Sequence, residues 1–593
     1  MSRIAILTIL TATAAVRPAP ATGAEPASPG PAGVPCTPWP ATDDLGRALP
    51  LSDITGPPRP DRFVGIFYFL WLNERANRSP HFDGPPDVSR ILARDPDALS
   101  KPDSPLWGPI GTFHYWGEPL YGYYLGSDPW VLRRHAHLLA DAGIDTLIFD
   151  TTNGLTYREI YMALCEVFAA VRAEGDPTPQ IAFMVNSAAG RTARQIYEDL
   201  YRPNLYPELW FRWQGRPLMI CDPAQADEEL RAFFTLRRAH WPHTIENTAY
   251  AWHWEAAYPQ VYGYTDDPGR PEQVNVSVAQ NLDIVSGLPV NMSEGRARGR
   301  SFHQGRTDRT PGAVRRGLNF QEQFERALQL DPPFVMVTGW NEWIAGRWGQ
   351  PGGPIIFVDQ FDQEHSRDIE PMKGGHGDDY YWQMVAGVRR YKGTPPLPAA
   401  SPPATIDLDG PMSQWESVRP EYRDHLGETA PRDFDGAGGL RYTHRTGRND
   451  IVSCRVARDD RRLYFQVRTR EPIVRHDSGW MWLLIDADRD ARTGWHGFDC
   501  VVNRTGGNRR AGRLEKYVQR RWEPVADVPL RVEGRDLHLA LEREQLGLTA
   551  GHTTAAIDFK WWDAPGPDPD IMDVYLNGDA APEGRFTFRY QAP

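Results

Sequence analysis

The chain's clearest chemical signal is a carboxylate between two indole rings. Trp340-Asn341-Glu342-Trp343 follows residues 334–338, a short apolar run that predicts a buried strand. Barrel enzymes carry their chemistry at the carboxyl ends of strands, and aromatic faces beside an acid suit the C–H face of a sugar ring. Glu342 is therefore a candidate catalytic group. A buried glutamate that only ties down a loop would give the same pattern.

Polar residues also follow four other predicted strands. These strands cover residues 146–150, 181–186, 218–222 and 249–254, and the polar residues at their ends are Asp150, Asn186, Asp222 and Glu255. The carboxyl ends of parallel strands meet at one face of a barrel. Each residue alone is a common way to begin a loop, but together they predict a polar cleft with aromatic walls.

The elements that must position these groups alternate between strand and helix. Further strands are predicted at residues 63–71 and 273–278, with helices at 128–142 and around 228–239. This alternation over some 330 residues predicts an α/β fold, a (β/α)₈ TIM-type barrel over residues 61–393. About seven strands can be identified, and the eighth is assumed.

Aromatic residues crowd the strand ends and a long loop at residues 73–127. Long loops in compact domains usually serve function, although this one could equally be a packed lid without ligand contact. The candidate substrate-binding residues are Tyr68, Trp71, Tyr115, Trp116, Glu118, Tyr124, Asn186, Trp254, Trp340, Asn341 and Trp343. Charged residues between Asp359 and Asp379 could line the cleft or lock their own loop through ion pairs.

Length, charge and the N-terminus limit the functional classes. A chain of 593 residues needs more than one core, and its net charge of -12 argues against nucleic acid as a partner. Residues 1–24 resemble a secretory signal peptide, which predicts a secreted protein, extracellular or periplasmic; an uncleaved anchor is the alternative. Residues 25–60 are rich in Pro, Ala and Gly, and no later stretch predicts a membrane span. No organic cofactor is expected, because no glycine-rich phosphate loop occurs between a strand and a helix.

A second domain follows a Pro-rich linker at residues 394–404. Alternating apolar residues over 405–593 predict an all-β sandwich. Asp486, Asp488 and Asp490 offer the oxygen ligands of a candidate Ca²⁺ site, although an Asp-rich hairpin without metal has the same sequence. Cys454 and Cys500 could form a disulfide in an oxidising compartment.

The barrel region resembles the glycoside hydrolase family 99-like proteins, which include relatives linked to O-antigen biosynthesis. The resemblance covers roughly residues 60–393, and its motifs are 64–68, 135–143, 149–153 and 340–343. It implies a (β/α)₈ barrel that hydrolyses α-mannosidic bonds with retention, in which Glu342 matches the carboxylate that assists the sugar 2-hydroxyl. In that family a second Glu, three residues later, acts as the acid/base, but here the position holds Ala345. The mannosidic specificity therefore does not carry over.

The C-terminal region resembles a family 9 carbohydrate-binding module. The resemblance rests on Ile406–Gly410 leading to Trp415, and on Asp486-Ala487-Asp488 with Thr493-Gly494-Trp495. It implies that aromatic rings bind glycan, and the candidate rings are Trp480, Trp482, Trp495, Trp561 and Trp562. Packing in the core would explain any one of these rings equally well.

These observations predict a secreted glycoside hydrolase that acts on a polysaccharide or glycan. Glycosidases normally use two carboxyl groups. Glu342 is the candidate nucleophile or base, and Asp150, then Glu255, then Glu118 are the candidate acids. One alternative is a glycan-binding protein whose barrel has lost its acid, as Ala345 suggests. Another is a structural or adhesive surface protein whose aromatic residues pack internally.

Overall fold

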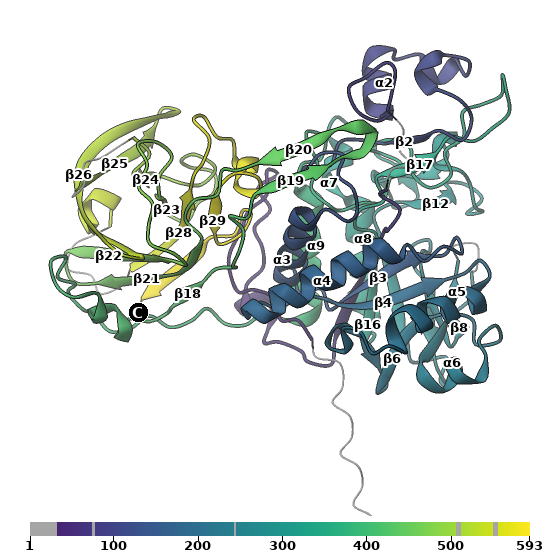
Figure 1. The fold of residues 1–593 in the computed structure, drawn as a ribbon, viewed down its shortest axis with the longest axis horizontal. Helices are drawn as coiled ribbons and strands as arrows, with labels where there is room; N and C mark the ends of the chain where they lie inside the picture. Colours follow the sequence, from purple (N-terminus) through teal and green to yellow (C-terminus); the bar gives the residue numbers. More distant parts are fainter. Residues whose placement is uncertain (1–32, 74–77, 242–244, 506–510, 549–554, 593) are drawn as a thin grey trace, which may run out of the picture.

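The computed structural model describes residues 33–592, apart from 74–77, 242–244, 506–510 and 549–554. The predicted signal peptide at 1–24 lies outside the described residues. Within the described part, no helix has both the length and the apolar character needed to cross a membrane. Figure 1 shows two bodies, an N-terminal α/β domain in purple to teal and a C-terminal β domain in green to yellow.

The N-terminal domain is built on a nearly closed barrel of parallel strands. In spatial order these are β11 (Gln273–Ser277), β16 (Phe334–Thr338), β1 (Phe63–Tyr68), β3 (Thr146–Thr151), β4 (Gln180–Val185), β6 (Arg216–Ile220), β7 (Thr235–His240) and β9 (Ala251–His253). Every residue of β1, β3, β11 and β16 is buried. This burial is typical of parallel strands covered on both faces. It explains the apolar runs of β1 and β16, whereas β11 also buries Gln273, Asn275 and Ser277.

One glutamine side chain bridges the gap in the barrel. Among the described residues, no backbone ladder joins β9 to β11. Instead, the backbone N–H of His253 donates to Gln273 Oε1 at 2.7 Å, and Gln273 Nε2 donates to the His253 carbonyl at 2.9 Å. The amide thus replaces one rung of the missing ladder. A short strand, β10 (Tyr262–Tyr264), pairs antiparallel with β11 beside this gap.

Helices cover the barrel unevenly. Those after the parallel strands are α3 (Pro129–Asp141), α4 (Arg158–Glu174), α5 (Ala189–Ile196), α6 (Glu228–Phe233), α8 (Leu318–Leu330) and α9 (Asp379–Lys392). In the described residues no helix separates β7 from β9 or β9 from β11. The barrel prediction is therefore confirmed for the parallel sheet, but the regular (β/α)₈ repeat is incomplete.

The predicted helix around residues 228–239 was wrong in its second half. The helix α6 ends at Phe233, and Thr235 begins β7, which pairs with β6 from Leu218↔Thr235 onward. The local pattern fits a helix, but the open edge of β6 offers a ladder of backbone hydrogen bonds that a continued helix would leave unmade. This segment is the eighth strand that the sequence could not identify.

Shorter helices and strands lie outside the parallel strands of the barrel. The long loop after β1 carries α2 (Val88–Arg94) and β2 (Phe113–Tyr115), which pairs antiparallel with β17 (Ile344–Gly346). The remaining short helices and strands of this domain are α1 (Ser52–Thr55), α7 (Ala313–Arg316), β5 (Arg212–Trp213), β8 (Thr248–Ala249), β12 (Gln280–Asp283), β13 (Ala297–Arg298), β14 (Phe302–His303) and β15 (Arg306–Thr307).

The C-terminal domain is antiparallel, as predicted for an all-β unit. Its sheet runs β18 (Tyr422–Arg423), β21 (Ile451–Arg458), β22 (Arg462–Thr469), β27 (Asp536–Glu542), β26 (Arg521–Glu533), β25 (Ala511–Val518), β24 (Cys500–Val502), β23 (Trp482–Asp486), β28 (Ala555–Asp563) and β29 (Asp579–Ala581), with β30 (Phe588–Ala592) on β28. The long strand β26 pairs first with β25 and then with β27, so it joins the two halves of the sheet around one core.

The structure decides two alternatives that the sequence left open in this domain. Cys454 and Cys500 are both buried and unpaired, so no disulfide joins them. The indoles of Trp480, Trp482, Trp561 and Trp562 are buried among aliphatic and aromatic neighbours, which leaves no ring face for a glycan. Trp495 alone of the five candidates is partly exposed.

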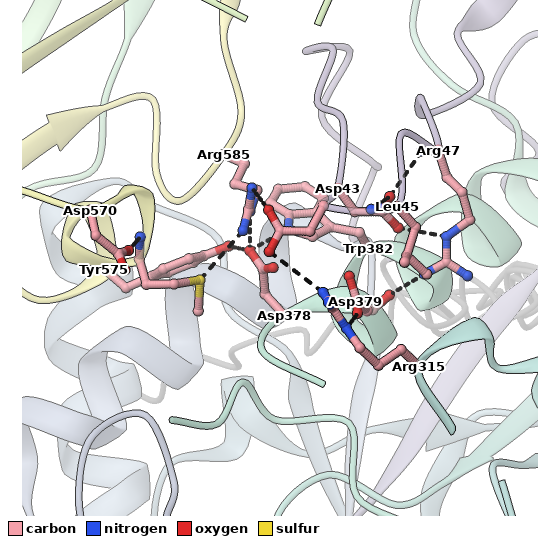
Figure 2. Close-up of polar contacts among 12 residues, drawn as sticks. Asp43, Leu45, Arg47, Arg315, Asp378, Asp379, Trp382, Asp570, Tyr575 and Arg585 are labelled. Carbon is pink, nitrogen blue, oxygen red and sulfur yellow. Dashed lines mark hydrogen bonds and ion pairs between the residues drawn. The ribbon is translucent and has the colours of Figure 1, made fainter. Parts of the chain in front are cut away.

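The two domains are joined by an arm and by the N-terminal segment. The arm is the hairpin β19 (Arg432–Asp435) and β20 (Arg441–His444), which reaches from the β domain to the barrel (Figure 1). Figure 2 shows a second junction, where Asp378 at the start of α9 accepts from Arg585 Nε at 2.5 Å and from the Tyr575 hydroxyl at 2.8 Å. Asp44 of the N-terminal segment also pairs with Arg585, at 2.8 Å.

Candidate active site

An open cleft of about 390 Å³ lies where the ends of β1, β3 and β16 meet. Its acidic lining residues are Asp150, Glu294, Glu342 and Asp359, and its aromatic walls are Phe67, Trp71, Trp241 and Trp254. Asp150 is the fifth residue of β3, and Glu342 follows β16. The predicted convergence of strand-end carboxylates is therefore present for these two residues.

A buried arginine organises the carboxylates. Arg367 is 1 % exposed, and its Nη2 lies 3.3 Å from Glu342 Oε2 and 3.9 Å from Asp359 Oδ1. Its Nη1 lies 3.7 Å from Glu255 Oε2 and donates to Asn281 Oδ1. The guanidinium also sits 4.6 Å from the centre of the Trp254 ring. One cation thus counters three acids and is held flat against an aromatic wall.

Glu342 is anchored on one oxygen and by its backbone. Gln360 Nε2 donates to Oε2 at 3.0 Å, and the backbone N–H of Glu342 donates to Asp368 Oδ1 at 2.6 Å. Burial raises the pKa of Glu342 well above its usual range; Arg367 opposes this rise, whereas Asp359, Asp368 and Asp150 add to it. Because these acids repel one another, they are not all ionised at once, and the ionisation of each depends on that of the others.

Asp150 occupies a drier and less charged part of the wall. Its Oδ1 accepts from the backbone N–H of Thr152 at 3.0 Å and from the Thr152 hydroxyl at 2.8 Å. Burial raises the pKa of Asp150 to about 6, although both hydrogen bonds oppose the shift. A carboxyl group with this pKa can hold a proton near neutral pH, which is what a general acid needs.

Glu255 lies behind the cleft and does not line it. It is 1 % exposed, and its Oε1 accepts from the backbone N–H of Asn281 at 2.8 Å. Burial raises its pKa to about 7, with Arg367 as the main opposing influence. The structure therefore makes Glu255 a counter-ion of Arg367, and this placement argues against its predicted role as the acid.

Several cleft residues were not among the predicted site residues. Asp359, Arg367 and Gln360, which contacts Glu342 without lining the cleft, come from the stretch after β17. Trp241 follows β7, and Asn281 lies on β12. The sequence left open whether the charges after Asp359 line the cleft or lock their loop, and the structure shows both. The signal was the dense charge of Arg367-Asp368-Ile369-Glu370 in a predicted loop.

The predicted substrate-binding residues separate into two groups. Trp71 and Trp254 line the cleft, and Asn186 stands beside it, where its Oδ1 accepts from Trp241 Nε1 at 3.2 Å. Seven others are almost fully buried outside the lining: Tyr68, Tyr115, Trp116, Tyr124, Trp340, Asn341 and Trp343. Glu118 pairs with Lys373 at a different surface.

Part of the buried group is organised around Glu370. This carboxylate accepts from the Tyr124 hydroxyl at 2.8 Å and from Trp343 Nε1 at 2.5 Å, and it faces His135 Nε2 at 3.0 Å. His135 Nδ1 in turn meets the Tyr68 hydroxyl at 2.9 Å. Polar edges of aromatic residues satisfy a buried acid here, so the aromatic pattern of the sequence reflects packing as much as ligand contact.

Ala345 does not face the cleft. It lies on β17, paired with His114 of β2, and it is buried in a cluster that includes Ile91 and Trp107. A carboxylate at this position would be buried among apolar side chains. The position three residues after Glu342 therefore offers no acid to the cleft, whereas Asp150 is a lining carboxyl whose pKa is raised.

In the C-terminal domain, the predicted metal residues are only partly together. Asp486 and Asp488 gather with Asp499, each offering an oxygen within 4.8 Å of the others, whereas Asp490 pairs with Arg492 at 2.6 Å. Burial and the acids Asp558, Asp499 and Asp488 raise the pKa of Asp486 to about 8. Three carboxylate oxygens fit the preference of Ca²⁺. Binding of Ca²⁺ at this turn stays a prediction, with Asp499 in place of Asp490.

Comparisons with known proteins give distant similarities only. No family profile and no curated protein sequence matches the chain. Among solved structures, the GH99 endo-alpha-mannosidase from Bacteroides thetaiotaomicron aligns at 12 % identity with a TM-score of 0.32, and its complex with BIS-TRIS-propane aligns at 12 % with 0.33. Each alignment covers 56 % of this chain and 97 % of the other.

Proposed function

We propose that the N-terminal domain is a glycoside hydrolase that cleaves a glycan in the cleft beside Arg367. One observation carries this proposal: two carboxyls, Glu342 and Asp150, line the same cleft as the aromatic side chains of Phe67, Trp71 and Trp254. Aromatic faces suit sugar rings, and glycoside hydrolysis requires an acid and a base or nucleophile. The substrate class proposed is a polysaccharide or glycan met outside the cell.

The two carboxyls differ in their surroundings, and this suggests their roles. Gln360 and Arg367 both point donors at Glu342 Oε2, and donors to a carboxylate favour its charged form. Its assignment as the base or nucleophile rests on these donors, which oppose the rise that burial gives to the pKa of Glu342. Asp150 has no cation in hydrogen-bond contact among the described residues, and its pKa of about 6 lets it donate a proton to the departing sugar oxygen.

Asp359 is the second choice for the acid. Glu342 and Asp359 contact the same Nη2, so their oxygens are no farther apart than 3.3 and 3.9 Å added together. This lies inside the upper limit of roughly 9.5 Å for paired glycosidase carboxyls. Burial also raises the pKa of Asp359, but its contact with the Arg367 guanidinium opposes this rise, whereas Asp150 makes no such ion pair among the described residues.

The first test is sugar release from a panel of polysaccharides by the wild type, Glu342→Gln and Asp150→Asn. Both variants should lose on the order of 10²–10⁴-fold in rate. Asp222→Asn is the matched control, because Asp222 also ends a strand but does not line the cleft. Its rate should equal that of the wild type.

An aryl glycoside with a good leaving group separates the two roles. Such a substrate needs little proton donation, so Asp150→Asn should recover most of its rate there, whereas Glu342→Gln should not. If the rate on the aryl glycoside recovers in Asp359→Asn and not in Asp150→Asn, the acid is Asp359. If the wild type releases no sugar but binds glycans in affinity electrophoresis, hydrolysis is excluded and the cleft is a binding site in which Arg367 permanently neutralises the acids.

A further inference from the structure

A second group of buried acids lies at the contact between the domains, far in sequence from the cleft residues. Asp424, Glu428 and Asp579 each offer one oxygen within 4.8 Å of the others, and all three side chains are buried. Asp424 and Glu428 belong to the segment after β18, and Asp579 begins β29. Ca²⁺ binds oxygens at 2.3–2.6 Å, so oxygens at this spacing can share one ion.

Each of these carboxylates has an oxygen without a donor. Within the described part of the chain, no hydrogen bond reaches Asp424 Oδ2, Glu428 Oε2 or Asp579 Oδ1. The neighbouring His137 Nε2 is also buried and without a partner there. Buried polar atoms are nearly always satisfied, so three orphaned oxygens in one group indicate a missing positive partner.

The charges around the group also indicate a missing positive partner. Glu583 is a fourth buried acid, close to Glu428 and His137. Two basic residues, Lys560 and Arg134, interact with these acids. His425 also interacts with Asp424 and Glu428, but its ring nitrogens pair with two other acids, Asp141 at 3.2 Å and Asp176 at 3.5 Å. Among the described neighbours, the acids of this group therefore outnumber the basic residues.

Hydrogen bonds hold one oxygen of Asp579 and one oxygen of Glu428 in place. Asp579 Oδ2 accepts from the backbone N–H of Ile451 at 2.5 Å, and Glu428 Oε1 lies 3.3 Å from His137 Nδ1. Lys560 Nζ is turned toward the carbonyl of Pro582. One oxygen of Asp579 and one of Glu428 are thus fixed by the fold while the other remains available.

We propose that Asp424, Glu428 and Asp579 bind one divalent cation of the calcium class, which acts as a clamp between the segment that rests on α3 of the barrel and the β sheet. All-oxygen donors select hard cations, and the neutral imidazole of His137 is near enough to extend the shell for Mn²⁺ or Zn²⁺. Without an ion the acids must take up protons, in line with the pKa of Asp424 and of Asp579, which burial raises well above the usual range.

The clamp would act on the domain contact because of where its ligands lie. The segment that carries Asp424 and Glu428 rests on α3 of the barrel, through Arg134 Nη2 to the Glu428 carbonyl at 3.3 Å and His425 to Asp141. Asp579 belongs to the β domain. An ion shared by these groups therefore ties the barrel-contacting segment to the sheet.

The test uses the full chain stripped with EDTA and exchanged into metal-free buffer. CaCl₂, MnCl₂ and ZnCl₂ are added separately, and bound ions per chain are counted after dialysis, alongside the midpoint of thermal unfolding. We expect Ca²⁺ to raise the midpoint of the wild type in a dose-dependent way. Asp424→Asn with Asp579→Asn should bind one ion fewer per chain and lose that rise.

The control is Asp488→Asn with Asp499→Asn, which disables the exposed turn and leaves the clamp intact. It should keep the clamp ion and the rise in midpoint. If the double clamp variant fails to fold, Asp424→Asn alone is counted in the same way. If the turn variant binds no Ca²⁺, Mn²⁺ or Zn²⁺, the acids hold protons instead and the proposal is wrong. Binding of Zn²⁺ or Mn²⁺ but not Ca²⁺ would overturn the calcium class and place His137 in the shell.

Discussion

At the scale of single residues, burial and one guanidinium set the chemistry of the cleft. Arg367 contacts Glu342, Glu255 and Asp359, and it lowers the pKa that burial would otherwise give to each of the two glutamates. Glu342 lines the cleft, whereas Glu255 stands behind the guanidinium. Exposure to the cleft, rather than residue type, therefore separates the candidate reactive group, Glu342, from the counter-ion Glu255.

Glu255 should make the stability of the protein depend on pH. Its pKa is about 7 in the folded chain and 4.5 in an exposed glutamate, so folding favours its protonated form. This stabilisation is complete below pH 4.5 and is lost as the pH rises through 7, by about 3 kcal/mol in all. Glu255→Gln removes the titration, so its free energy of unfolding relative to the wild type should rise by that amount between pH 4.5 and 8.

Urea unfolding at a series of pH values measures this difference. Glu166→Gln, on the exposed face of α4, reports the effect of the amide change itself. An equal pH dependence for Glu255→Gln and the wild type would mean that Glu255 stays ionised in the fold.

At the scale of elements, the barrel depends on a side chain where a ladder is missing. Gln273 makes both hydrogen bonds to the backbone of His253 across the β9–β11 gap. Trp254 and Glu255 follow directly after β9, so this contact also sets the position of the Trp254 ring, against which the Arg367 guanidinium lies. Closure of the barrel and geometry of the cleft are therefore linked at one residue.

Gln273→Ala should destabilise the protein by about 2–4 kcal/mol, because it leaves a buried N–H and a buried carbonyl unpaired. Gln321→Ala, on the exposed side of α8, is the control and should change the free energy of unfolding by less than about 0.5 kcal/mol. Both are measured by urea denaturation. Equal, small losses would show that water or a backbone shift satisfies the gap.

At the scale of the whole molecule, the β domain holds the barrel through buried charge. Arg432 of the arm donates to Asp128 Oδ2 at 2.7 Å and to the Tyr121 carbonyl at 2.8 Å. Asp128 is also the N-cap of α3, where its other oxygen accepts from the backbone N–H of Trp130. The arm thus secures both a barrel helix and the long loop before it.

Arg432→Ala should cost about 3–5 kcal/mol, because it leaves Asp128 buried without its cation. Arg441→Ala is the matched control on the same hairpin, since Arg441 is half-exposed and its pairs with Asp433 and Asp435 are worth little. Calorimetry of the full chain should show the barrel transition at lower temperature in Arg432→Ala only. A thermogram that matches the wild type would mean that the arm does not stabilise the barrel.

The sequence by itself determined the local features that depend on short-range pattern. The continuous apolar runs of β1, β3 and β16 predicted buried parallel strands, Asp128-Pro129 predicted the start of α3, and alternation predicted the antiparallel second domain. The same runs placed Asp150 and Glu342 at the carboxyl ends of strands, because each of these residues ends or follows an apolar run.

Only the tertiary structure decided which polar and aromatic residues face the cleft. Tyr68, Trp340 and Trp343 look like ligand contacts in the sequence, yet all three are buried. Trp343 donates to Glu370, the Trp340 carbonyl accepts from the Glu370 N–H, and Tyr68 meets His135, which faces Glu370. Arg367 and Asp359 become cleft residues because their loop folds back over β16. Burial and charge compensation depend on every neighbour in space, whatever its distance along the chain. A local pattern could therefore mark residues 367–370 as densely charged but could not show which of them face the cleft.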